Sequence, residues 1–170
     1  MKKSILVITV AIVTFLSSCG DKKKTASSGN TTSSETTGLT VNDDEGKSGN
    51  FSVDGTSFKG KSSTQYFGDK VTGQFSVLCQ QDEPFALLQA VFANEAAATG
   101  NLKPADGFYS METGEAHIAL SGNSFGDKEF VTTSSSTGSI IISGKELVIK
   151  DLKLYNSDKQ EKTVSATIPF

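Results

Sequence analysis

Apolar side chains recur at every second position through much of the chain after Asn50, with polar side chains between them. This period of two is typical of β-strands that bury one face. The alternation is clearest at 71–79, 115–121 and 163–168. Weaker patterns predict further strands at 64–67, 107–112, 128–133 and 138–143.

A hairpin is predicted at the start of this region, from Asn50 to Lys59. Asp54-Gly55 between two apolar runs is a strong signal for a two-residue turn. The resulting register places Phe51 opposite Phe58, which makes an aromatic pair on one face of the sheet.

The stretch 146–155 changes phase part-way along. Its apolar residues share one face before Lys150 and the other face after Asp151. They are Leu147 and Ile149, then Leu152 and Leu154. If both pairs are buried, the strand needs an extra residue near Lys150 or Asp151, and a β-bulge supplies one.

The stretch 81–100 has two interpretations. Asp82 could cap a helix, Pro84 suits a first helical turn, and Gly100 could end the helix. The segment 85–92 also fits the second strand of a hairpin. We favour a strand there, followed by a short helical turn at 94–99, and a helix at 83–99 is the alternative.

These patterns predict an all-β domain at 50–170. The expected architecture is a twisted antiparallel β-sandwich or a flattened β-barrel with a short helical turn. If 83–99 is helical, the class becomes α+β, with that helix packed on the sheet. A length of about 120 residues is enough for one hydrophobic core.

The N-terminus has the features of a targeting segment. Lys2 and Lys3 precede thirteen residues, 4–16, of which ten are apolar and none is charged. Spanning a bilayer takes roughly 20 apolar residues, so this shorter run matches the apolar core of a secretory signal. The run ends at Leu16-Ser17-Ser18-Cys19.

An aliphatic residue, two small residues and a cysteine in this order resemble the lipobox of bacterial lipoproteins. The resemblance implies a signal peptide at 1–18 and acylation of Cys19 on its sulfur and its new amine. Two or more acyl chains anchor a protein stably, at about 0.8 kcal/mol per buried CH₂. Gly20 follows, whereas Asp at that position favours retention at the inner membrane. The resemblance therefore implies an outer-membrane anchor, with the domain periplasmic or surface-facing.

The Lys-rich start, the Ser-Ser-Cys box and the polar tether are also similar to small lipoproteins of Bacteroidota. Short matches continue in the domain, at Gly107-Phe108-Tyr109, Thr137-Gly138-Ser139-Ile140 and Thr163-Val164-Ser165. This similarity implies an all-β domain in the cell envelope and no particular chemistry.

Residues 19–49 are expected to form the lipidated cysteine and a disordered tether. After Cys19 only Ala26, Leu39 and Val41 are apolar, so the segment cannot bury enough surface to fold. A flexible chain of this length has an r.m.s. span of about 30 Å and extends to roughly 100 Å.

Composition narrows the possible chemistry. All sixteen positive side chains are lysines and the net charge is −3, which argues against a nucleic-acid partner. One histidine and two cysteines are too few for a zinc site. The domain also lacks an Asp-x-Asp-x-Asp loop for calcium and a glycine loop for phosphates, so no metal or cofactor is expected.

The single histidine and the domain's cysteine are expected to be structural. On the alternation of 115–121, His117 points away from its apolar neighbours and hence to solvent. Cys79 falls on the apolar face of 71–79, which predicts a buried, unpaired thiol of low reactivity.

Carboxylates and tyrosines are weaker candidates for catalytic or ligand-binding residues. A suitably spaced carboxylate pair can hydrolyse glycosides, but no motif selects a pair from the candidates. These candidates are Glu112, Glu115, Asp127 and Glu129. Tyr66, Tyr109 and Tyr155 could form a platform for sugars or peptides, although a partly buried place in the sheet is favoured for each.

The sequence therefore indicates how the protein is exported and anchored, but it contains no motif that identifies a reaction or a ligand. We expect a non-enzymatic, lipid-anchored β-domain that binds an envelope protein or glycan. Contacts are expected at Asp54-Gly55, at Gly126-Asp127 and in the 93–106 connection. The alternatives are an envelope hydrolase that uses paired carboxylates and a β-barrel carrier of an apolar ligand.

Overall fold

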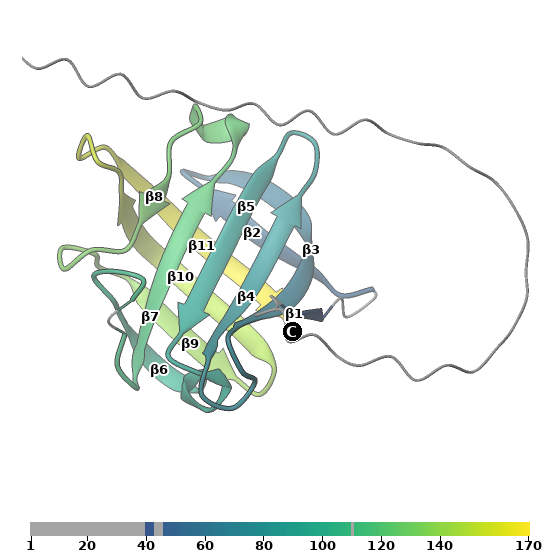
Figure 1. Ribbon diagram of the computed structural model, residues 1–170. Helices are drawn as coiled ribbons and strands as arrows, with labels where there is room; N and C mark the ends of the chain where they lie inside the picture. Colours follow the sequence, from purple (N-terminus) through teal and green to yellow (C-terminus); the bar gives the residue numbers. More distant parts are fainter. Residues whose placement is uncertain (1–39, 43–45, 110) are drawn as a thin grey trace, which may run out of the picture. The chain divides into compact units, whose positions relative to one another are not determined.

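The computed structural model describes residues 40–42, 46–109 and 111–170, so the predicted signal peptide, Cys19 and most of the predicted tether lie outside it. The described residues form eleven strands and two single-turn 3₁₀-helices (Figure 1). The strands are β1 (Thr40–Asn42), β2 (Ser48–Val53), β3 (Thr56–Phe67), β4 (Gln74–Gln81), β5 (Ala86–Phe92), β6 (Gly100–Pro104), β7 (Glu115–Ser121), β8 (Phe130–Val131), β9 (Ser139–Ser143), β10 (Glu146–Tyr155) and β11 (Glu161–Pro169). The 3₁₀-helices are η1 (Glu95–Ala97) and η2 (Asn123–Phe125). No helix in these ranges has the length and apolar character needed to cross a bilayer.

The all-β prediction is confirmed, and the sheet closes on itself. Nine strands follow the order β3-β2-β11-β10-β9-β6-β7-β5-β4, and β4 pairs back with β3. Neighbours around this barrel-like sheet are antiparallel except β6 and β7, which are parallel. β1 pairs with the last residues of β3, and β8 pairs with both β7 and β10.

The two predicted features of local geometry are confirmed. Asp54 and Gly55 both have positive φ, 50° and 84°, and Phe51 lies opposite Phe58 with ring centroids 5.0 Å apart. In β10 the register shifts between Ile149 and Leu152, so the apolar residues on both sides of the bulge are buried. The predicted strand at 85–92 is β5, and the helix alternative at 83–99 is wrong because only Glu95–Ala97 turns helically.

One hydrophobic cluster fills the interior of the barrel. Phe75 is 1% exposed, and its ring lies 6.1 Å from that of Phe92 and 5.9 Å from that of Phe170. Cys79 is fully buried and unpaired in the same cluster, as predicted. Rings that pack against one another in this way indicate a structural role for the interior phenylalanines, as expected in a small barrel.

Several strands begin at other residues than predicted. β2 begins at Ser48 and β1 covers 40–42, both ahead of the predicted domain start at Asn50. Val71 is not in a strand but is 81% exposed in a turn, because the Asp69 carboxylate accepts backbone hydrogen bonds from Val71 and Thr72 and β4 begins only at Gln74.

The strand predicted at 107–112 is also not formed. Residues 105–109, which we call the strap, instead lie against the outer face of the sheet, where the Phe108 ring contacts Phe67 and His117. The backbone of Gly107 has a φ of 119°, which suits glycine and interrupts an extended strand.

Candidate functional site

A groove of about 700 Å³ lies on the outer face of four adjacent strands, β10, β11, β2 and β3. Its floor is formed by residues whose side chains point into the barrel, and its walls carry side chains that point outward. The floor residues are Phe51, Phe58, Ile149 and Ala166. The outward residues are Asn50, Ser52, Ser57, Lys59, Val148, Lys150, Ser165 and Thr167, joined by Gln81 from the end of β4.

Strand register arranges the outward side chains in two rows across the sheet. In one row Val148 lies opposite Thr167, Thr167 opposite Asn50, and Asn50 opposite Lys59. In the next row Ser165 lies opposite Ser52, and Ser52 opposite Ser57. Neighbouring strands are about 4.8 Å apart, so hydroxyl and amide groups repeat at that spacing across the groove.

The bulge in β10 forms one side of the groove. Its extra residue turns the Asp151 backbone N–H toward β11, where it donates to Ser165 Oγ at 3.0 Å. The Ser165 hydroxyl donates in turn to Asp151 Oδ1 at 3.3 Å. Bulges bend and twist a strand, and this one fixes the direction of Ser165, the serine at the β11 end of the second row.

Gln81 forms the opposite side of the groove. Its Oε1 accepts a hydrogen bond of 3.1 Å from the backbone N–H of Lys59. Its Nε2 donates to the Pro84 carbonyl oxygen at 3.1 Å. The first bond joins the end of β4 to β3, and the second fixes the side chain against the turn between β4 and β5.

The charge of the groove is opposite to that of the domain. From residue 50 onward the chain has ten lysines and fourteen acidic residues. Of the described residues that line the groove, two are lysines and none carries a carboxylate. Within the described part of the chain, neither the Lys59 nor the Lys150 ammonium group has an ion-pair partner, whereas Lys128, Lys145, Lys153 and Lys162 all do. The groove can therefore offer hydrogen bonds and positive charge to a ligand.

The prediction that His117 faces solvent is wrong. The strand alternates as expected, but the strap covers the outer face of β7, and His117 is only 7% exposed. Its Nδ1 lies 3.2 Å from Thr132 Oγ1. Burial lowers the pKa of His117 below its ordinary value, because the effects of the Ala105 backbone, Glu129 and Asp106 only partly offset the loss of solvation. The imidazole is thus neutral near pH 7 and has the environment of a structural residue.

The four carboxylates considered for hydrolysis do not form one site. Glu112 and Glu115 meet at the turn before β7, where the Glu112 backbone N–H donates to Glu115 Oε2 at 3.1 Å. Asp127 and Glu129 lie on another loop, between η2 and β8. None of the four lines the groove. The described residues contain no group of three or more His, Cys, Asp or Glu side chains placed to hold a metal ion.

The three tyrosines form no common platform, because Tyr66 on β3 is buried, Tyr109 is exposed on the strap, and Tyr155 is on β10, which is not adjacent to β3 in the sheet. Tyr66 is buried, and its hydroxyl donates to Glu95 Oε2 at 2.7 Å. Burial and this carboxylate raise the pKa of Tyr66 to about 12. Tyr155 is half-buried, as favoured, whereas Tyr109 is 92% exposed, contrary to the favoured interpretation.

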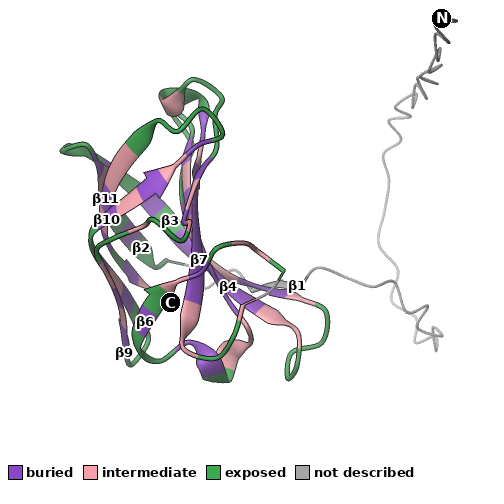
Figure 2. Ribbon diagram, turned by 90° about the vertical axis from the view of Figure 1, so that its left-hand side faces the viewer, coloured by how far each residue is buried: buried purple, intermediate pink, exposed green. Residues whose placement is uncertain are grey.

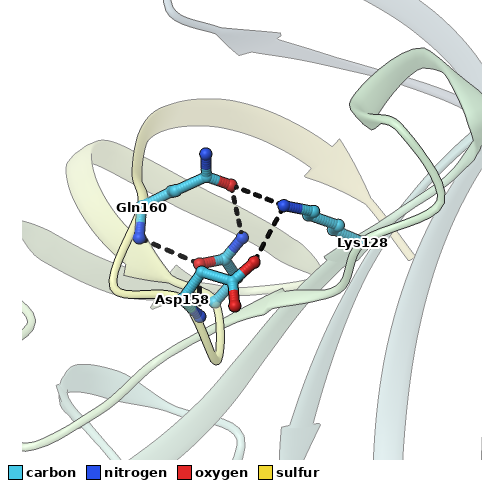
Figure 3. Close-up of polar contacts among 4 residues, drawn as sticks. Lys128, Asp158 and Gln160 are labelled. Carbon is cyan, nitrogen blue, oxygen red and sulfur yellow. Dashed lines mark hydrogen bonds and ion pairs between the residues drawn. The ribbon is translucent and has the colours of Figure 1, made fainter.

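The turns where contacts were expected are bonded within the molecule. Asp54 accepts hydrogen bonds from Lys162 Nζ at 2.6 Å and from the Thr163 backbone N–H at 2.9 Å. Beside Gly126-Asp127, Lys128 Nζ lies 2.8 Å from Asp158 Oδ2 and 3.1 Å from Gln160 Oε1 (Figure 3). These contacts tie the loop after η2 to the turn between β10 and β11.

Known proteins give no further guide to this site, because the chain matches no protein-family profile, no curated protein and no solved structure. Sequence reasoning missed the groove. The polar face of 163–168 was visible in the alternation, but its apposition to 50–52 depends on the pairing of β11 with β2, which are separated by more than one hundred residues.

Proposed function

We propose that this protein is a lipid-anchored lipoprotein of the bacterial cell envelope, most simply of the outer membrane. Its β-barrel domain binds a polar, anionic partner in the groove of β10, β11, β2 and β3. The observation that carries the binding proposal is the composition of the groove on a domain with excess negative charge. The groove has rows of hydroxyl and amide groups and two lysines that have no ion-pair partner among the described residues.

The anchor is supported by the order of the N-terminal features, which are the two lysines, the apolar run and Leu16-Ser17-Ser18-Cys19. A Cys19→Ser variant should accumulate as uncleaved precursor and take up no labelled fatty acid. Cys79→Ala is the matched control, because it removes the chain's other cysteine and should leave labelling intact. Labelled fatty acid on the Cys19→Ser protein would contradict the anchor.

Binding in the groove can be tested by crosslinking in intact cells. A photoreactive residue at Thr167, which lines the groove, should capture a partner reproducibly. The same residue at Ser157, which is exposed in the turn after β10, is the control and should not. Equal capture from both positions, or capture from Ser157 alone, would contradict a partner in the groove.

Charge reversal tests the electrostatic part of the proposal. Lys59→Glu with Lys150→Glu should weaken capture at least about tenfold, equivalent to about 1.4 kcal/mol, because both changes remove positive charge from the groove. Lys159→Glu, at an exposed position in the turn after β10, alters net charge without touching the groove. If the two sets of variants behave alike, the partner does not recognise the groove's charge.

A further inference from the structure

We infer that the end of the barrel that carries Val71 and Tyr109 rests on the bilayer to which the protein is anchored, with both side chains in the lipid interface. This inference depends on the proposed lipid anchor at Cys19 and concerns a surface separate from the groove. It identifies the orientation of the domain at the membrane.

The first observation is exposure. Tyr109 is 92% and Val71 81% exposed, and the other exposed large apolar side chain in the described ranges, Phe85, is only 36% exposed. Leaving such side chains in water stabilises nothing, and a tyrosine ring with its polar hydroxyl is suited to a membrane interface.

The second observation is that these two side chains belong to connected segments. The turn 68–73 carries Val71 and the strap carries Tyr109. Gln74, just after the turn, donates from Nε2 to the Phe108 carbonyl oxygen at 2.7 Å. The Phe108 ring lies 5.5 Å from Phe67 and 5.0 Å from Tyr109. A chain of ring contacts therefore supports the exposed tyrosine from the sheet.

The third observation is where the chain reaches the barrel. β1 is antiparallel to β3, and its first residue, Thr40, lies opposite Tyr66, one residue before Phe67 (Figure 1). β1 thus starts at the end of the barrel where β3 finishes and the turn 68–73 begins. Twenty residues separate the proposed anchor, Cys19, from Thr40. The described chain therefore begins at the end of the barrel that carries the exposed pair, and an anchor at Cys19 would act on that end.

The charges of the turn 68–73 and of the strap indicate which kind of membrane surface they would contact. The turn and the strap carry Asp69, Lys70 and Asp106, so they have no excess of positive charge. The Asp69 carboxylate is also bonded within the turn, to the backbone N–H groups of Val71 and Thr72 and to the Thr72 hydroxyl. Contact through Val71 and Tyr109 should consequently occur on zwitterionic phospholipid and should resist salt, unlike attraction to anionic headgroups.

The chain has no tryptophan, so one introduced tryptophan reports on one position. The lipidated full-length protein would be reconstituted on phosphatidylcholine vesicles with and without brominated acyl chains, which quench tryptophan on contact. In the Tyr109→Trp and Val71→Trp variants, emission should shift to shorter wavelength on vesicles and be quenched by the brominated lipid in both low and high salt. The Phe85→Trp variant is the matched control, because Phe85 lies in the β4–β5 turn at the opposite end of β4, and it should be neither shifted nor quenched.

Flotation of the same vesicles separates the two proposals. Protein that floats but shows no quenching at either position, or equal quenching for Phe85→Trp, would overturn this inference and leave the anchor standing. Protein that does not float would overturn both. A blue shift that grows with protein concentration in the absence of vesicles would show that the pair contacts a second copy of the chain, and would also overturn the inference.

Discussion

Two walls of the barrel share the same alternation but differ in what covers their outer faces. On the parts of β10, β11, β2 and β3 that line the groove, the outward side chains are exposed or half-buried. On β4, β5 and β7, several outward positions are buried: Ser76 and Val91 are fully buried and His117 is 7% exposed. Figure 2 shows an unbroken run of buried residues along β7, at 116–120. We call these the open wall and the covered wall.

The difference shows that alternation determines the direction of a side chain but not its burial. On the covered wall, polar groups that face outward have partners inside the molecule. Gln89 Nε2 lies 3.4 Å from Ser76 Oγ. Thr132 Oγ1, which lies next to the His117 ring, accepts a hydrogen bond of 3.1 Å from the Ile118 backbone N–H. On the open wall, most outward polar groups have no such cover, so they remain available to a ligand.

The largest expected effect tests the two faces of the open wall. Phe51 is 2% exposed and stacks on Phe58, so Phe51→Ala should lower the free energy of unfolding by about 3–5 kcal/mol. Its neighbour Ser52 points into the groove, and Ser52→Ala should change stability by no more than about 0.5 kcal/mol. Urea denaturation of both variants measures the contrast. Similar losses for the two variants would mean that the wall has no exposed face.

The second prediction compares the walls at one residue type. Val91 and Val148 both point away from the barrel interior, but the first is fully buried and the second half-buried. Val91→Ala should cost about 2 kcal/mol because it removes buried methyl groups, whereas Val148→Ala should cost about 0.5 kcal/mol or less. Equal costs, measured by the same denaturation, would remove the distinction between a covered and an open wall.

Much of the architecture could be predicted from short-range pattern. The Asp54-Gly55 turn, the bulge near Asp151 and the inward face of Cys79 each depend on residues within a few positions of one another. The strap and the groove could not be predicted in this way. His117 is buried by Phe108, which lies outside its strand, and Thr167 meets Asn50 only after the chain has closed a barrel. The predicted alternation was right in the strands of both His117 and Thr167. The sequence pattern did not show that the strap packs on the first strand or that β2 pairs with the second.

The third prediction uses the pH dependence of the covered wall. Burial lowers the pKa of His117 in the folded state, while in the unfolded chain it titrates near 6.5. As pH falls below about 6.5 the unfolded state takes up a proton that the folded state does not, so stability decreases, by at most about 1.4 kcal/mol per pH unit. Because the chain has one histidine, His117→Asn should flatten the stability profile between about pH 5 and 6.5.

A matched control separates this effect from carboxylate titration. Hydrogen bonds from Tyr66 and Lys145 lower the pKa of Glu95, so its contribution is present above its ordinary pKa and is lost only at lower pH. Glu95→Gln should therefore leave the slope above pH 5 unchanged. A slope in that interval that survives in His117→Asn would show that the strap does not keep the imidazole buried.

The smallest expected effect concerns the interior side of the covered wall. Cys79 points inward from β4, is fully buried, and has a pKa that burial raises above its ordinary value. Both effects disfavour the reactive thiolate, so a thiol reagent should label the native Cys19→Ser protein slowly and the denatured protein rapidly. Cys79→Ala should cost only about 1 kcal/mol, because a small side chain is lost from a packed site. Ellman titration with and without denaturant measures the protection. Rapid labelling at native pH and temperature would mean that β4 opens readily to solvent, and then the burial of Ser76 and Val91 beside it could not be attributed to a stable cover.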